Sequence, residues 1–359
     1  MSKDAINTNL PFGVRLTGGL KLRKAGITGA GVRVAIIDSG IDAKHPGFNG
    51  RIVKQQWYRE GPLHDHGTHI AGTVHMMAPD ADIYDYRVYG KEGNIDVDDA
   101  IIQAIKQACD DECRVINLCL CLEAHYINPM IQDQIKIAHE KGVIVVCSSS
   151  KRESTNPLIN STWYVHGITS IPSSILDHVI SSNDFCYFKN ENSPTLIGGF
   201  RYPAFIDEVL QVAAVGNKGK DLMALFSDSN PDFDYYGVGS DVWSFKAGGG
   251  FQVMSGTSMA CAHVTGFVAA ISCEGNKIAN SKLNASLRKQ FLVNLNMSTN
   301  CKKAPKISFL TFLDQDECDA VWREEMDSDY DRLLSMTLNE MSLLKDRLSN
   351  SRRIDNLSQ

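Results

Sequence analysis

Short apolar runs that alternate with helical segments constrain the fold of this chain more than any other feature. Segments 97–110 and 129–141 repeat apolar residues at the spacing of one helix face. Five runs have the aliphatic composition of buried strands: 32–37, 82–88, 114–119, 143–147 and 209–215. Successive parallel strands need a crossover, which a helix usually supplies on one face of the sheet. We therefore predict an α/β fold with a doubly wound, mainly parallel central sheet and helices on both faces.

The composition predicts a sizeable core and argues against several classes of partner. Hydrophobic residues make up 43% and charged residues 22% of the 359 residues, as in ordinary globular proteins. The net charge of −6 gives no reason to expect nucleic-acid binding, and no apolar run approaches the roughly 20 residues of a membrane-spanning helix. We expect neither nucleic acid nor a membrane as a partner, and no cofactor.

The cysteines and the first residues predict the compartment. The ten cysteines lack zinc-ribbon spacing, and the N-terminal residues lack the apolar stretch of a signal peptide. We therefore expect reduced, mostly buried thiols and a cytoplasmic protein. Secretion would require that the chain is incomplete at its N-terminus.

The chain divides into a lead-in, a central domain and a charged tail. Residues 1–25 form the lead-in, 26–300 hold the strand–helix alternation, and 301–359 form the tail. Within the tail, residues 330–348 place apolar side chains at helical spacing, which predicts an amphipathic helix: Leu334, Met341, Leu344 and Leu348. Docking of this helix on the domain is the simpler interpretation, and contact with a partner is the alternative.

An aspartate ends the first predicted strand. The segment "VRVAIIDSGIDAKHP" places Asp38 directly after the apolar run and before Ser39 and Gly40. Sites in parallel sheets lie at the carboxyl ends of strands, where a carboxylate could orient a histidine. The alternative is a turn residue that binds neighbouring backbone N–H groups.

Three histidines lie close together in "LHDHGTHIAGTV". His64, His66 and His69 could all be metal ligands, but a zinc site would also need an acidic or cysteine ligand and a second-shell partner, and the sequence identifies none. A helix of small residues follows Gly67, which places His66 at its entrance as a candidate general base and turns His69 inward. We predict no metal site, and a purely structural cluster is the other alternative.

A serine opens a run of very small residues in "VMSGTSMACAHVTG". Ser258 follows Gly256 and Thr257, so its hydroxyl lies on an uncrowded turn at a helix N-terminus. Backbone N–H groups at such a terminus can stabilise an oxyanion. The alternative is a serine that caps a buried helix, in which His263 would be a packed residue.

Together these motifs resemble the subtilisin-like serine proteases, or subtilases. The matching stretches are "AIIDSGID", "HGTHIAGTV", "APDADIYDYRV", "VINL", "YPA" at 202–204 and "GTSMACAHVTG", over roughly residues 10–295. The chain order Asp, His, Ser is the known subtilisin order. The resemblance implies that Ser258 is the nucleophile, His66 the general base and acid, and Asp38 the group that holds the imidazolium.

The chain departs from the family pattern at four places. The cleft strand, usually "SLGG", reads "CLCL", so Cys119, Leu120 and Cys121 become candidate substrate-binding residues in a narrowed cleft. Ala262 replaces the usual proline after the nucleophile. From the sequence given, we expect no pro-region before the domain. The loop of the usual calcium site is short and Gly47 stands where an aspartate is expected, so we predict no calcium.

The family's oxyanion residue raises a further question. In subtilases an asparagine ends the strand that corresponds to "GVIVVCSSS", but here Ser150 and Lys151 follow. Joining Ser149 to Ser182 restores the register and places Asn183 at the oxyanion position. Residues 150–181 would then be an insertion, either a surface excursion or a retained non-coding segment.

The resemblance implies a serine endopeptidase that acts through an acyl-enzyme on peptide or protein substrates. An alternative is a catalytically impaired, subtilase-like scaffold that binds peptides, given the filled cleft and the displaced asparagine. A metal-dependent hydrolase that uses the histidine cluster would leave "SGTSMA" unexplained.

Overall fold

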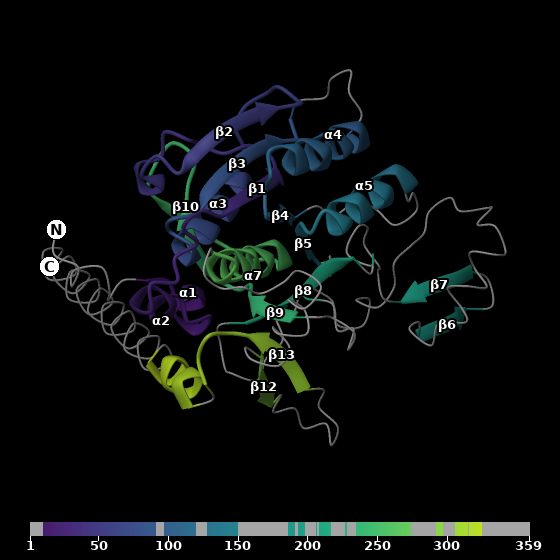
Figure 1. Cartoon of the computed structure of the whole chain (residues 1–359). Coiled ribbons are helices and arrows are strands. Elements are labelled where there is room, and N and C mark those ends of the chain that lie inside the picture. Colours follow the sequence, from purple (N-terminus) through teal and green to yellow (C-terminus); the bar gives the residue numbers. More distant parts are fainter. Residues whose placement is uncertain are drawn as a thin grey trace, which may run out of the picture. The chain divides into compact units, whose positions relative to one another are not determined.

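A nine-stranded sheet runs through the described part of the chain (Figure 1). This computed structural model describes residues 10–90, 97–119, 128–149, 206, 208–216, 227, 235–273, 311–314 and 316–324, and the backbone of strands at 186–190, 193–197, 292–296 and 306–310. The strands of the sheet are β1 (Arg33–Asp38), β2 (Ile52–Trp57), β3 (Asp82–Arg87), β4 (Val115–Leu118), β5 (Ile144–Ser148), β8 (Val209–Val215), β9 (Tyr235–Val238), β12 (Leu292–Asn296) and β13 (Lys306–Leu310).

The strand order is that of a doubly wound fold. It runs β12-β13-β9-β8-β5-β4-β1-β3-β2, and every neighbouring pair is parallel except β12 and β13. The predicted, mainly parallel sheet is therefore confirmed. All five runs that predicted strands form β1, β3, β4, β5 and β8, whereas β2, β9, β12 and β13 were not predicted.

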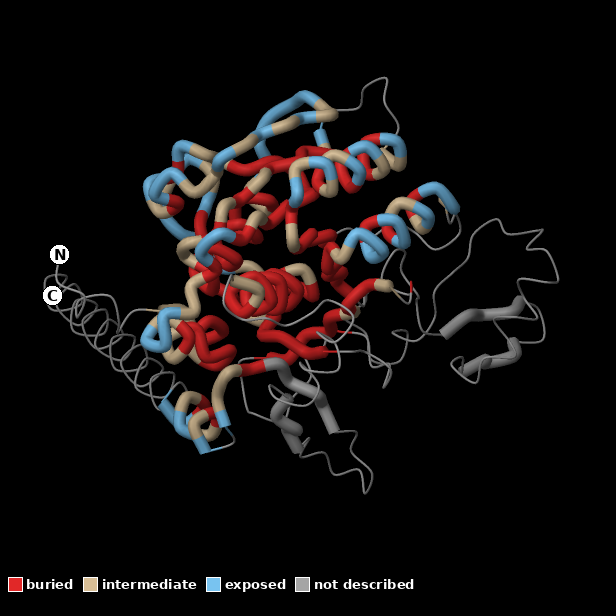
Figure 2. The backbone as a smooth tube through the Cα atoms, viewed as in Figure 1, coloured by how far each residue is buried: buried red, intermediate tan, exposed pale blue. Residues whose placement is uncertain are grey.

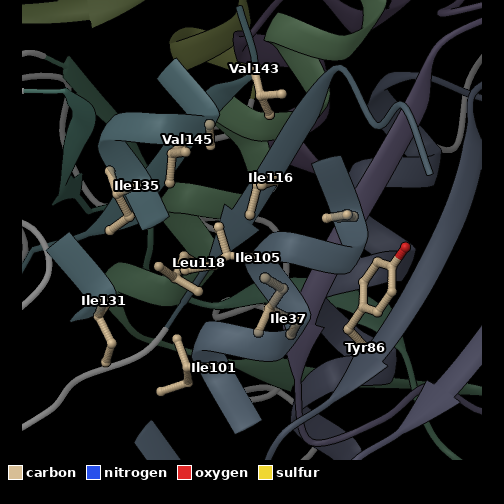
Figure 3. Close-up of a cluster of buried hydrophobic side chains, with 14 of the residues drawn as sticks. Ile37, Tyr86, Ile101, Ile105, Ile116, Leu118, Ile131, Ile135, Val143 and Val145 are labelled. Atoms are coloured by element: carbon tan, nitrogen blue, oxygen red, sulfur yellow. The ribbon is translucent and has the colours of Figure 1, made fainter. Parts of the chain in front are cut away.

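Helices cover both faces of the sheet. On one face lie α4 (Val97–Asp110) and α5 (Pro129–Glu140), which confirm the two predicted helices. Asn128 caps α5 by accepting a hydrogen bond from the N–H of Met130 at 3.0 Å, and Pro129 occupies the first turn. The apolar sides of α4 and α5 pack on the sheet in the cluster of Figure 3: Ile37, Tyr86, Ile101, Ile105, Ile116, Leu118, Ile131, Ile135, Val143 and Val145.

The other face carries α3 (Asp65–Met77) and α7 (Thr257–Ile271). Nearly every residue of α7 is buried, as the red tube at the centre of Figure 2 shows. Small residues let the two helices approach closely: a Cβ added at Gly266 would lie 2.5 Å from the Cβ of Met77. The side chain of Asn117, on β4, donates to Thr265 Oγ1 at 2.8 Å and so joins α7 to the sheet.

Two antiparallel hairpins lie outside the main sheet. Strands β10 (Val242–Phe245) and β11 (Phe251–Met254) form one of them, and β6 (Cys186–Asn190) and β7 (Ser193–Ile197) form the other. The second lies between Asp184 and Arg201. A short 3-10 helix, Pro46–Phe48, precedes β2.

Helices and a strand also lie outside the expected central domain of residues 26–300. In the lead-in, α1 (Phe12–Leu16) and α2 (Gly19–Lys24) precede β1, and the carbonyl of Leu16 accepts a hydrogen bond from Thr311. Strand β13 extends the sheet beyond the expected boundary at residue 300, and contacts divide the chain into Met1–Asp314 and Gln315–Gln359. The second unit is helical at 316–324.

Two of the predicted segments fall outside the described residues. They are the insertion at 150–181 and the amphipathic helix at 330–348. Among the helices that the structure does describe, none combines the length and the hydropathy that crossing a bilayer requires.

Candidate active site

Asp38 is the last residue of β1, at the carboxyl edge of the sheet. Its side chain is only 1% exposed, and Oδ1 accepts a hydrogen bond from the N–H of Ser39 at 2.6 Å. The strand continues the register with β3 as far as this residue, which lies opposite Arg87. A carboxylate held so rigidly and out of water can act on a neighbouring group with little screening.

That neighbouring group is the imidazole of His66, in the first turn of α3. Its Nδ1 lies 2.9 Å from Asp38 Oδ1 and 3.0 Å from Oδ2. A proton on Nδ1 that is donated to the carboxylate leaves Nε2 as the lone-pair nitrogen, which is the tautomer that a general base needs. The side chain remains 28% exposed.

The electrostatic balance at His66 favours the imidazolium. Burial lowers the pKa of His66, but the charge of Asp38 and the hydrogen bond to it together outweigh burial and raise that pKa above its usual value. The predicted helix entrance for His66 is confirmed. Its pairing with Asp38 is the arrangement that the resemblance implied.

The three histidines of the motif face different partners. His64 precedes α3, and its Nδ1 accepts a hydrogen bond from the N–H of His66 at 3.2 Å. His69 is fully buried, as predicted, with Nε2 at 3.0 Å from the carbonyl of Val242. No three His, Cys, Asp or Glu side chains in the described ranges are grouped so that they could hold a metal ion.

Ser258 is the second residue of α7 and is half-buried. The preceding turn is held in place: Gly256 N–H donates to the carbonyl of Gly239 at 2.8 Å, and Thr257 Oγ1 donates to the carbonyl of Ser149 at 2.8 Å. Ser149 directly follows β5, so α7 begins at the same carboxyl edge of the sheet at which Asp38 lies (Figure 1).

Cys119, a candidate substrate-binding residue, directly follows β4 and is 6% exposed. Its thiol donates to the carbonyl of Ser258 at 3.3 Å, which connects β4 with the first turn of α7. Burial, followed by the contact with Cys261, raises the pKa of Cys119 well above its usual value, so the thiol is protonated at neutral pH. Leu120, Cys121 and the candidate oxyanion residue Asn183 lie outside the described residues.

Sequence reasoning did not single out the polar residues that surround this pair. Asp85 and Arg87, both on β3, are buried next to β1, and Ser39 links the loop after Asp38 to α3. One signal was available in the sequence. The run 82–88 alternates apolar residues with charged ones at positions that a central strand buries.

The chain matches the model of the Subtilase family (Peptidase_S8) over residues 29–300. It is 26% identical over 277 residues to an intracellular serine protease of Paenibacillus polymyxa, covering 72% of this chain and 71% of that protein. It is 24% identical over 295 residues to the major intracellular serine protease of Bacillus subtilis (strain 168), covering 77% and 79%. Against subtilisin E of Bacillus subtilis (strain 168) the identity is 27%, over 73% of this chain and 61% of that protein.

Solved structures agree on the fold. The prenylagaramide maturation protease PagA superposes with a TM-score of 0.60 at 18% identity, over 85% of this chain and 98% of that one. A cold-adapted subtilisin-like serine proteinase gives a TM-score of 0.57 at 20% identity, over 79% and 90%. The family match spans more than half of the chain, so this protein belongs to the subtilase family. The relatives from Paenibacillus polymyxa and Bacillus subtilis that carry the word intracellular in their names are both named as serine proteases.

Proposed function

We propose that this chain is a serine endopeptidase whose catalytic triad is Asp38, His66 and Ser258. The observation that carries the proposal is the contact between His66 Nδ1 and both oxygens of the buried Asp38, at 2.9 and 3.0 Å. Membership of the subtilase family and the start of α7 at the carboxyl edge of the sheet support the role of Ser258.

The chemistry follows from these positions. Ser258 Oγ attacks the carbonyl carbon of a peptide bond while His66 Nε2 accepts the hydroxyl proton. Asp38 keeps Nδ1 protonated and stabilises the imidazolium that forms. His66 then gives its proton to the leaving amine, and an acyl-enzyme remains on Ser258. Water, deprotonated by His66, attacks that ester, releases the acid and restores the serine.

Asn183 completes the proposal as the oxyanion donor. Its support is the restored register of "GVIVVCSSSND" and the position of Ser149, whose carbonyl is bound by Thr257 next to Ser258. Asn183→Ala should lower kcat about 10²- to 10³-fold with little change in KM, since the donor acts on charge that develops in the transition state. Asn160→Ala, inside 150–181, is the matched control, and equal effects of the two changes would refute the assignment.

We also propose that the protein works inside the cell. Two of its relatives are named as intracellular proteases. In the described part of the chain, the cysteines are free thiols: Cys109, Cys113, Cys119, Cys147, Cys261, Cys273 and Cys318. Free, largely buried thiols are typical of reducing compartments. Fractionation of the source cells, with detection of the protein by antibody, tests the assignment.

A serine-directed fluorophosphonate probe tests the catalytic assignment. Labelling should map to Ser258 by peptide mass spectrometry and disappear in Ser258→Ala. Ser272→Ala, at the other end of α7, should label like the wild type because its hydroxyl only donates to the carbonyl of Val268. A folded wild-type protein that does not label would instead be the impaired peptide-binding scaffold. Labelling that persists in Ser258→Ala would place the nucleophile elsewhere.

A further inference from the structure

A buried carboxylate, Asp85, lies on the strand next to the one that carries Asp38. Strands β1 and β3 are parallel, with Asp85 opposite Ile36 and Arg87 opposite Asp38. The side chain of Asp85 is fully buried. Burial of a carboxylate is costly unless hydrogen bonds compensate for the lost water, so its contacts show what holds it there.

Those contacts converge on the loop that follows Asp38. One carboxylate oxygen of Asp85, Oδ2, accepts three hydrogen bonds: from Ile41 N–H at 3.1 Å, Gln55 Nε2 at 2.9 Å and Trp57 Nε1 at 3.0 Å. Gln55 Nε2 also donates to the carbonyl of Ile41 at 2.8 Å. Both backbone polar groups of Ile41 are therefore held by side chains of β2 and β3, three residues after Asp38.

The opposite side of the same loop contacts α3. Gly67 N–H donates to Ser39 Oγ at 3.0 Å. A Cβ added at Gly67 would lie only 2.4 Å from the carbonyl oxygen of Gly40, so the two backbones are in direct contact. Gly67 directly follows His66. A shift of the loop at Ile41 would therefore be transmitted to the turn that carries the imidazole.

Arg87 fixes the segment that leads into α3. Its guanidinium donates to three carbonyls: Gly61 at 2.9 Å, Pro62 at 2.7 Å and Tyr89 at 2.8 Å. Trp57 joins the two charged groups, because its ring N–H binds Asp85 while its face lies 5.1 Å from the guanidinium carbon of Arg87. Asp85 and Arg87 thus hold the two segments on either side of the Asp38–His66 contact.

We propose that Asp85 is a positioning residue for the Asp38–His66 pair and acts through Ile41. The proposal rests on the catalytic role proposed for that pair. Gln55 and Trp57 complete the arrangement and shield the carboxylate from water. Misplacement of reacting groups by about 1 Å can cost on the order of 10²-fold in rate, so a small shift of this loop is enough to matter.

The state of Asp85 adds a pH dependence. Burial raises the pKa of Asp85 to about 6, although the hydrogen bonds from Trp57, Gln55 and Ile41 lower it. The charged groups that face it are Asp38 on β1, whose charge raises that pKa further, and Arg87 beyond the Trp57 ring. A protonated carboxyl accepts hydrogen bonds more weakly than a carboxylate, so the loop is held less firmly below about pH 6.

The test compares rates of fluorophosphonate labelling and peptide hydrolysis in four variants. Asp85→Ala should lower the labelling rate and kcat about 10-fold or more, with little change in KM, because orientation rather than substrate binding is lost. Asp85→Asn keeps a carbonyl oxygen for the three donors, so it should restore most of the rate at pH 8. In the pH–rate profile, Asp85→Asn should also remove the loss of rate that protonation of Asp85 causes near pH 6. Gln55→Ala should cause a smaller loss.

Asp82→Asn is the matched control, since Asp82 lies on the same strand and pairs with Arg51 in a half-exposed contact. Its rate should equal that of the wild type. A wild-type rate in folded Asp85→Ala, or an equal loss in Asp82→Asn, would overturn the proposal. If Asp85→Ala does not fold, the rate measured in Gln55→Ala decides whether the proposal holds. The Gln55 side chain is exposed, so its truncation should leave the fold intact. An unchanged rate in that variant would contradict the proposal.

Failure of the catalytic assignment gives a different result. In that case the wild-type protein itself would not label at Ser258. The positioning role is then decided by NMR titration of the His66 imidazole, which does not depend on activity. A lower pKa of His66 in Asp85→Ala than in Asp85→Asn, which also lacks the charge but keeps the acceptor oxygen, supports positioning of the Asp38–His66 contact, and equal values reject it.

Discussion

The two halves of the candidate site are held in different ways. Asp38 and His66 lie among side-chain hydrogen bonds that involve Ser39, Asp85 and Gln55. Ser258 lies in the first turn of a helix that is buried along nearly its whole length and approaches α3 through small residues. The first half should therefore respond to changes of charge and hydrogen bonding, whereas the second should respond to changes of volume.

The largest effect is expected from Asp38→Asn. The carboxamide has nearly the same size but no charge, and its NH2 group can favour the wrong tautomer of His66. Loss of this aspartate should lower kcat by about 10⁴-fold. Initial rates on a peptide substrate measure it, with folding checked by circular dichroism. Asp42→Asn, whose carboxylate accepts from Gly248 N–H at the exposed surface, should stay near wild-type activity. A loss of less than 10-fold in Asp38→Asn would contradict the role.

Gly266→Ala tests whether the close packing of α7 against α3 is sensitive to added volume. The new Cβ would lie 2.5 Å from Met77 Cβ and 3.0 Å from the carbonyl of Val74, so α3 and α7 must separate. Overpacking of this kind costs about 1–3 kcal/mol of unfolding free energy. Urea denaturation measures the loss. Ser272→Ala, at the end of the same helix, should be close to neutral, and an unchanged midpoint in Gly266→Ala would show that the interface is looser than described.

The strands that the sequence could predict differ in composition and length from those that it could not. The strands that became β1, β3, β4, β5 and β8 are aliphatic runs whose burial needs no knowledge of their partners. Edge strand β2, "IVKQQW", mixes polar with apolar residues because one side faces solvent, and β9 is only four residues long. Neither carries a periodic signal strong enough to distinguish it from a loop.

The candidate site divides in the same way. Asp38, His66 and Ser258 could be singled out because each stands at the end of a core element in a recognisable motif. The contacts of Ile41 with Asp85 and Gln55 join residues that are 44 and 14 positions apart in the sequence. Such contacts depend on the register between parallel strands, which a single sequence does not specify.

A smaller effect is expected where one hydrogen bond joins the start of α7 to the edge of the sheet. Thr257→Val keeps the shape of the side chain but removes the donor to the carbonyl of Ser149. The net loss should be about 1 kcal/mol of unfolding free energy, with slower labelling of Ser258. Thr73→Val is the control, since the Thr73 hydroxyl donates its hydrogen bond to the carbonyl of His69 within α3 itself. Equal effects of the two changes would remove any special role for Thr257.

The smallest effect, a shift in a titration, compares two histidines of one helix. Burial lowers the pKa of His69 to about 4, whereas at His66 the charge and hydrogen bond of Asp38 outweigh burial and raise the pKa above 6.5. The general base must be neutral, so kcat/KM should rise with pH through the raised pKa of His66.

Protonated His66 also stabilises the folded state fully below pH 6.5, and this contribution disappears as pH rises through its folded-state pKa. NMR titration should give a pKa above 6.5 for His66 and a pKa of about 4 for His69. Asp38→Asn should lower only the pKa of His66. Equal values for the two rings in the wild type would mean that Asp38 does not control His66.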